Sequence, residues 1–125
     1  TSTALLSEAY AEAIQVGILL PYSGVYATLG QDIDDAFALG LETFGADSGA
    51  TFEIVREDTE VKPPVGLAKT KKLILQDEVD VMVGVVSSGV LGAIRDTVDG
   101  AGVPLIVANA RNDEATGEAT QLALL

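Results

Sequence analysis

The chain has 125 residues, of which 48% are hydrophobic, so it can bury the core of one folded domain. Nineteen acidic against seven basic residues give a formal net charge of −12, which disfavours nucleic acid and anionic membranes as partners. The chain has no Cys and no His, which removes the thiolate nucleophile, Cys-based metal sites and the commonest general base and metal ligand. With no catalytic or phosphate-binding motif besides, we expect no enzyme, no metal site and no cofactor.

The two ends of the chain differ in composition from its centre. Residues 1–13 are rich in alanine and end in Ala-Glu-Ala, a pattern of small residues like the one before a signal cleavage site. A positive start and a long apolar centre are missing, so we expect a helical leader or arm and no complete signal peptide. The predicted division is this arm, a single α/β domain at 14–111, and an acidic and then apolar tail at 112–125.

The first predicted elements are a strand over 14–20 and a helix over 31–44, joined by a loop over 21–30. Apolar residues recur every three to four positions in the helix, as on a half-buried helix, and Gly45 is expected to end it. Negative charge is favoured near a helix N-terminus, so we expect the first turn to hold Asp32, Asp34 and Asp35.

A second strand is predicted over 51–56, followed by a helix that includes Pro64 in its first turn and ends near Gln76. Three lysines of this helix are expected in solvent. Its buried face is expected to consist of Leu67, Ala68, Ile74 and Leu75.

The third unit is a strand from Val79 to Gly84, a helix to about Ala101 capped by Ser88, and a fourth strand from Pro104 to Val107. Both strands are nearly continuous apolar runs, which is typical of parallel strands that are covered on both faces. The buried stripe of the helix is expected to be Leu91, Ile94, Val98 and Ala101.

The order β-α-β-α-β-α-β predicts an α/β fold, an open, doubly wound parallel sheet of flavodoxin-like strand order 2-1-3-4 with helices on both faces. Strand 104–107 then lies at an edge of the sheet and is free to pair with another chain. Ligands of such sheets bind outside the carboxyl ends of the strands.

Polar residues follow strands three and four at this edge. Ser87 and Ser88 precede a helix, where hydroxyl and backbone N–H groups can hold a carboxylate, although a simple helix cap accounts for them equally well. Arg111 can pair with a ligand carboxylate or with neighbouring acidic residues.

Rival classes with the same topology need residues that this chain lacks. A phospho-acceptor receiver domain needs acidic residues after strand one and an Asp after strand three, where Leu20-Pro21-Tyr22 and Val85-Val86 stand. The loop Ser23 to Thr28 matches the phosphate loop of a flavodoxin-like cofactor binder only weakly.

Four stretches in order carry a resemblance to a known family: IQVGILLPYSGVYATLGQD from residue 14, Glu57-Asp58, VDVMVGVVSSG from residue 79, and GVPLIVANA from residue 102. Over about 14–114 the chain resembles the N-terminal lobe of branched-chain amino-acid (Leu/Ile/Val) type periplasmic solute-binding proteins. These are receptors of ABC importers and have the type I periplasmic binding fold.

The resemblance implies an extracytoplasmic, periplasmic lobe that binds a small organic carboxylate and meets the membrane component of an ABC transporter. Transferred by position, the ligand-binding residues are Tyr26, Ser87, Ser88, Asn109, Ala110 and Arg111. Asn109 and Arg111 stand where amino-acid binders carry small or hydroxyl residues, so aromatic and aliphatic carboxylates remain open beside amino acids.

Such receptors have two lobes and the resemblance extends over the first only, so we do not expect capture by hinge closure to carry over to this sequence. The alternative is a lobe whose main property is self-assembly. Because strand 104–107 and the apolar ends of the chain would otherwise be exposed, we predict a homodimer or higher oligomer.

Overall fold

The computed structural model describes residues 13–108 and 122–124. In chain order the elements are β1 Ile14–Leu20, the single 3-10 turn η1 Gly24–Tyr26, α2 Ala27–Ser48, β2 Phe52–Asp58, α3 Pro63–Leu75, β3 Val81–Gly84, α4 Ser88–Ala101, β4 Leu105–Val107 and β5 Leu122–Leu124. None of the helices in the described ranges is long and apolar enough to cross a bilayer.

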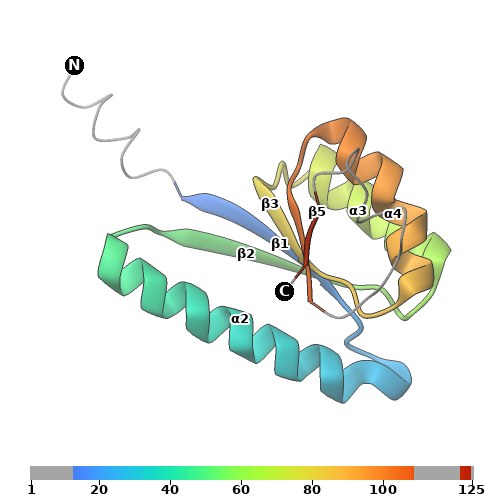
Figure 1. The fold of residues 1–125 in the computed structure, drawn as a ribbon, viewed down its shortest axis with the longest axis horizontal. Helices are drawn as coiled ribbons and strands as arrows, with labels where there is room; N and C mark the ends of the chain where they lie inside the picture. Colours follow the sequence, from blue (N-terminus) through green and yellow to red (C-terminus); the bar gives the residue numbers. More distant parts are fainter. Residues whose placement is uncertain (1–12, 109–121, 125) are drawn as a thin grey trace.

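The strands form one parallel sheet in the order β2-β1-β3-β4-β5, which confirms the predicted order 2-1-3-4 for the first four. Helix α2 lies on one side of the sheet, whereas α3 and α4 lie on the other (Figure 1). The last residues of β1 and β2, Leu20 and Asp58, are register partners, and Gly84 at the end of β3 pairs with Leu19. The loops that follow these three strands therefore start side by side at one edge.

Each face of the sheet has its own apolar core because successive side chains of a strand point to opposite faces. On the α3 and α4 side, Leu19 and Met82 pack with Leu91 and Ile94. On the α2 side, Ile18 and its neighbours contact partly buried residues of the helix, which are Ile33, Phe37 and Leu41. The predicted stripe of α2 thus faces the sheet over these three residues, whereas its predicted last member, Phe44, is 56% exposed.

Helix α2 is longer than predicted at both ends. It begins at Ala27 because η1 leads directly into it, so its first turn holds no acidic residue and the expectation for Asp32, Asp34 and Asp35 was wrong. Gly30 lies inside the helix, where a Cβ would come within 1.9 Å of the Pro21 carbonyl oxygen. Gly45 does not end the helix; Gly49, with φ 78°, adopts the left-handed conformation that ends it.

Several other boundaries shift by a few residues. The second strand continues to Asp58 because it pairs with β1 along its whole length, and the third begins at Val81, not Val79. Helix α4 is capped by Ser87, not Ser88: the Ser87 backbone is extended, and its side chain accepts the N–H of Val90.

Two of the predicted helix faces were partly wrong. In α3 the buried residues are Gly66, Thr70 and Leu73, so Leu75 points away from the core and is 74% exposed. Ala68 is exposed as well. In α4 the stripe begins at Val90 and ends at Val98, which leaves Ala101 exposed.

The outer edge of β4 is not free. β5 pairs with β4 in parallel, from Leu105 with Leu122 to Val107 with Leu124, so the expectation of an open edge at 104–107 was wrong. A homodimer or higher oligomer stays a prediction, without that support. The predicted arm at 1–13 lies outside the described residues apart from Ala13, and so does most of the tail at 112–125.

Candidate ligand-binding site

The loop after β3 brings a helix N-terminus to the carboxyl edge of the sheet. Gly84 has φ 131°, and a Cβ there would lie 2.2 Å from the Leu19 carbonyl oxygen, so only glycine fits. Val85 is fully buried with φ 68°, and its N–H donates to the same carbonyl at 2.8 Å. This strained turn aims Ser87 and the start of α4 out of the sheet.

The start of α4 is arranged as an N-terminal cap. The Ser87 side-chain oxygen accepts the Val90 N–H at 3.3 Å, and the Ser87 carbonyl accepts the Leu91 N–H. Ser88 and Gly89 are the first residues of this 14-residue helix. The positive end of the helix dipole is therefore directed at the same edge.

A cavity of about 540 Å³ lies in front of this helix end. Tyr26, at the junction of η1 and α2, lies on its wall with Leu29 of α2 and Val61 of the β2–α3 loop. The β3–α4 segment contributes the remaining lining residues, which are Val86, Ser87, Ser88 and Gly89.

Three of the six predicted site residues thus share one cavity: Tyr26, Ser87 and Ser88. The other three, Asn109, Ala110 and Arg111, lie outside the described residues. The sequence interpretation missed several lining residues. Leu29 is three positions after Tyr26 on a helix that was predicted to begin later, and Val61 is an apolar residue in a loop where no sequence pattern marked it as a lining residue.

The described lining of this cavity is apolar at its sides and carries hydroxyl and amide groups at one end. No charged side chain is among those lining residues. Such a site offers hydrogen-bond donors and a positive helix end to an anionic group, and an apolar wall with one aromatic ring to the rest of a ligand.

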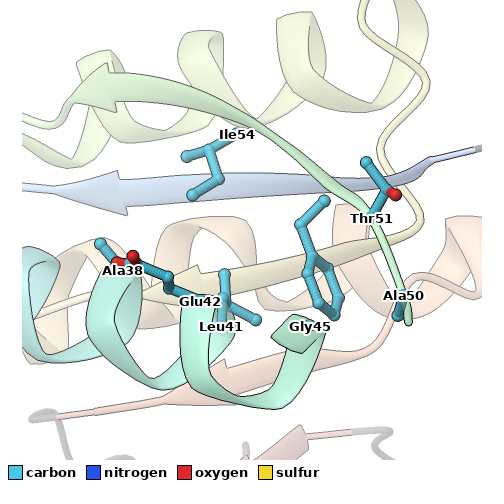
Figure 2. Close-up of a pocket in the computed structure, with 8 residues that line it drawn as sticks. Ala38, Leu41, Glu42, Gly45, Ala50, Thr51 and Ile54 are labelled. Atoms are coloured by element: carbon cyan, nitrogen blue, oxygen red, sulfur yellow. The ribbon is translucent and has the colours of Figure 1, made fainter. Parts of the chain in front are cut away.

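A second cavity, of about 340 Å³, lies between the C-terminal half of α2 and the start of β2. Figure 2 shows Leu41 of the helix facing Ile54 of the strand across it. Its lining is mainly apolar, with Glu42 as its one charged residue among those described. It has no cluster of donors and is far from the strand ends that bind ligands in such sheets.

A third cavity, of about 780 Å³, opens at the amino ends of the strands. It is acidic, lined among others by Glu53, Asp77, Glu78 and Asp80, so it repels an anionic ligand. In the part of the chain that the structure describes, no group of three or more Asp and Glu side chains is placed to hold a metal ion.

Comparison with known proteins places the chain among binding proteins. Residues 13–121 match the sequence profile of a family described as periplasmic binding protein. The Leu/Ile/Val-binding protein homolog 6 of Brucella abortus is 27% identical over 110 residues, which cover 83% of this chain and 27% of that protein. The chain thus spans about a quarter of the length of that relative.

Solved structures give the same result. An ABC transporter substrate-binding protein from Sphaerobacter thermophilus is 31% identical with a TM-score of 0.79, over 86% of this chain and 29% of that one. A branched-chain amino acid transporter substrate-binding protein from Streptococcus pneumoniae, in complex with isoleucine, is 27% identical with a TM-score of 0.82, over 90% and 33%. An ABC transporter solute-binding protein from R. palustris, in complex with benzoate, is 36% identical with a TM-score of 0.75, over 90% and 32%.

Proposed function

The chain belongs to the periplasmic binding protein family, as a lobe of the type I fold, and from that premise we propose that it recognises a small organic carboxylate for an ABC importer. The observation that carries the proposal is the cavity in which Tyr26 and the residues Ser87 and Ser88 line one space at the carboxyl ends of the strands. The ligand carboxylate would contact the start of α4, and its apolar part would lie against Tyr26, Leu29 and Val61.

The proposal gives the two serines different roles. Ser87 caps the helix through the Val90 N–H, so the proposal assigns its side chain to stability and assigns the ligand contact to Ser88 and the neighbouring backbone. Loss of an N-cap costs about 1 kcal/mol of stability. Ser87→Ala therefore changes stability and binding together, and Ser88→Ala is the variant that tests the proposed contact, with its stability measured beside its binding.

The lining favours carboxylates that lack an ammonium group. An α-amino acid needs a counter-charge for its ammonium, and the described lining holds no acidic residue. Related solute-binding proteins from R. palustris were solved with benzoate and with 4-hydroxybenzoate, whereas the Streptococcus pneumoniae relative was solved with isoleucine. We therefore place aromatic carboxylates first and branched aliphatic amino acids second.

The biological setting follows from the family in the same proposal. The lobe works outside the cytoplasm and delivers its ligand to the membrane component of a transporter, without catalysis. Self-assembly remains the alternative, since the predicted oligomer is untested.

The test is a thermal-shift and NMR titration of the chain with benzoate, 4-hydroxybenzoate, hexanoate and L-isoleucine at millimolar concentration. We expect a carboxylate to shift the amide signals of Ser88 and Gly89. Ser88→Ala should then weaken binding by about 1.5–3 kcal/mol, the range for a lost hydrogen bond to a charged group. Ser48→Ala, at the far end of α2, is the control and should bind as the unmodified chain does. Absence of any shift at those amides would reject the site.

A further inference from the structure

One carboxylate ties together two of the loops that surround the cavity. Asp58 is the last residue of β2, and its side chain accepts three hydrogen bonds. Oδ1 accepts the backbone N–H of Tyr22 at 2.9 Å and that of Glu60 at 2.8 Å. Oδ2 accepts the hydroxyl of Ser23 at 2.7 Å. Asp58 thus holds the loop after β1 against the loop after β2.

The loop after β2 needs such support because its backbone is strained. Glu60 and Val61 have φ of 53° and 57°, a left-handed conformation that costs energy in a residue with a side chain and most in a β-branched one such as Val61. Two further hydrogen bonds, in addition to those of Asp58, hold this turn. The buried Thr59 donates its N–H to the Leu20 carbonyl and accepts the Val61 N–H at its hydroxyl.

Each loop carries one wall of the cavity. Tyr26 follows Ser23 by three residues, across the single turn η1, and Val61 follows Glu60 directly. Asp58 itself does not line the cavity, so it can influence a ligand there only through these neighbours.

We propose that Asp58 is a positioning residue for the cavity: by binding Tyr22, Ser23 and Glu60 it sets Tyr26 and Val61 at a fixed separation before a ligand enters. Walls that are ordered in advance lower the entropy cost of binding. The inference rests on the proposed function, because it assigns a role in the same site.

The alternative is that Asp58 acts by its charge. Lys69 of α3 is the charged neighbour that favours its ionised form. The positioning role depends on the acceptor geometry instead. An asparagine keeps an oxygen for the two N–H groups, so Asp58→Asn should conserve most of the function, whereas Asp58→Ala should not.

The binding test titrates benzoate and L-isoleucine into the whole chain and its variants at one pH and salt concentration. For Asp58→Ala we expect about tenfold weaker binding, equivalent to about 1.4 kcal/mol. For Asp58→Asn we expect binding near that of the unmodified chain. The control is Glu57→Gln, which removes a charge from the neighbouring residue, whose side chain pairs with Lys69 and Lys72, and should leave binding unchanged. Unchanged binding in Asp58→Ala, or equal losses in Asp58→Ala and Asp58→Asn, would overturn the proposal.

A measurement without ligand separates this inference from the proposed function. Backbone ¹⁵N relaxation should show Tyr26 and Val61 ordered in the unmodified chain and in Glu57→Gln, and mobile in Asp58→Ala. If no probe binds the unmodified chain, the proposed function fails, and the relaxation result alone decides whether Asp58 orders these walls. If Asp58→Ala does not fold, Ser23→Ala removes one exposed bond of the three and should show the same changes at smaller size. Unaltered relaxation and binding in Ser23→Ala would then count against the proposal.

Discussion

At the scale of single residues, the most consequential group outside the cavity is the carboxylate of Asp34. It is 4% exposed on α2, yet it accepts the Arg56 Nε–H at 2.9 and 3.1 Å and the Tyr22 hydroxyl at 3.0 Å. A buried charge is tolerated only when it is paired in this way. The three side chains come from α2, β2 and the loop after β1, so they fasten the start of α2 to the sheet.

Tyr22 makes this cluster sensitive to alkaline pH. Burial, then the hydrogen bond to Asp34 and its negative charge, raise the pKa of Tyr22 well above the usual 10.0. The folded state therefore holds the phenol proton more tightly than the unfolded state does. The contribution to stability is complete below pH 10 and is lost as the pH rises above it.

We expect the free energy of unfolding to fall more steeply above pH 10 in the unmodified chain than in Tyr22→Phe. Urea unfolding at pH 8, 10 and 11 measures this slope. Tyr22→Phe should be less stable by about 1 kcal/mol at pH 8 and should approach the unmodified chain at pH 11. Parallel curves for the two proteins would show that the phenol does not titrate as the structure implies.

The sequence could not reveal this cluster. The acidic run at Asp32, Asp34 and Asp35 is equally consistent with negative charges placed near a helix N-terminus. The partner of Asp34, Arg56, is 22 residues away in sequence and lies on another element. By contrast, Ser87 and Ser88 could be predicted as cavity residues from the local sequence. A glycine, two hydroxyl residues and a change from a continuous apolar run to helical spacing mark the turn between strand and helix.

At the scale of elements, the strands followed from the sequence more faithfully than the helix ends and the outer members of the helix faces did. Apolar runs fix a strand because burial dominates its energetics, whereas a helix end depends on single contacts. Gly30 was assigned to the loop before the helix and Gly45 to its end, but both lie inside α2. At Gly30 the close approach to Pro21 explains the glycine.

Two glycines in helix interiors provide a matched test of packing between elements. A Cβ at Gly66 of α3 would lie 2.6 Å from Val90 Cγ1 of α4, whereas a Cβ at Gly40 of α2 would meet nothing within 4 Å. We expect Gly40→Ala to raise the free energy of unfolding by about 0.5–1 kcal/mol. We expect Gly66→Ala to lower it by about 1–3 kcal/mol, because overpacking exceeds the gain in helix propensity.

Chemical denaturation of the two variants measures both changes on one scale. Val90→Ala serves as the companion substitution, because it removes the Val90 methyl groups with which the new Cβ of Gly66→Ala would clash. The double variant should lose less than the sum of the two single losses. Equal gains from Gly40→Ala and Gly66→Ala would mean that α3 and α4 are not in close contact at this point.

At the scale of the whole molecule, the sheet order was predictable because parallel strands joined by helices admit few right-handed arrangements. β5 was not, since Leu122–Leu124 is three residues long and separated from β4 by a long stretch without apolar periodicity. Its pairing with β4 is a contact between segments far apart in sequence. The same pairing is why an oligomer can no longer be argued from an open edge.

Charge is the other property of the whole molecule, and it opposes compactness. Nineteen acidic against seven basic residues repel one another across the surface. The described ion pairs offset this only locally, as between Lys72 and Asp77 at 2.7 Å. Salt shortens the reach of the repulsion, from about 30 Å at 0.01 M to about 10 Å at 0.1 M. Short contacts such as the one between Arg56 and the buried Asp34 are screened much less.

We therefore expect the midpoint of thermal unfolding at pH 7 to rise when NaCl increases from about 0.01 M to about 0.1 M. The same titration near pH 4.1, the isoelectric point of the sequence, is the control, because the net charge is then close to zero and the rise should disappear. Differential scanning calorimetry measures both series. A midpoint that falls with salt at pH 7 would mean that surface ion pairs outweigh the repulsion. In that case the attraction between the seven basic residues and their acidic neighbours would stabilise the fold more than the excess of negative charge destabilises it.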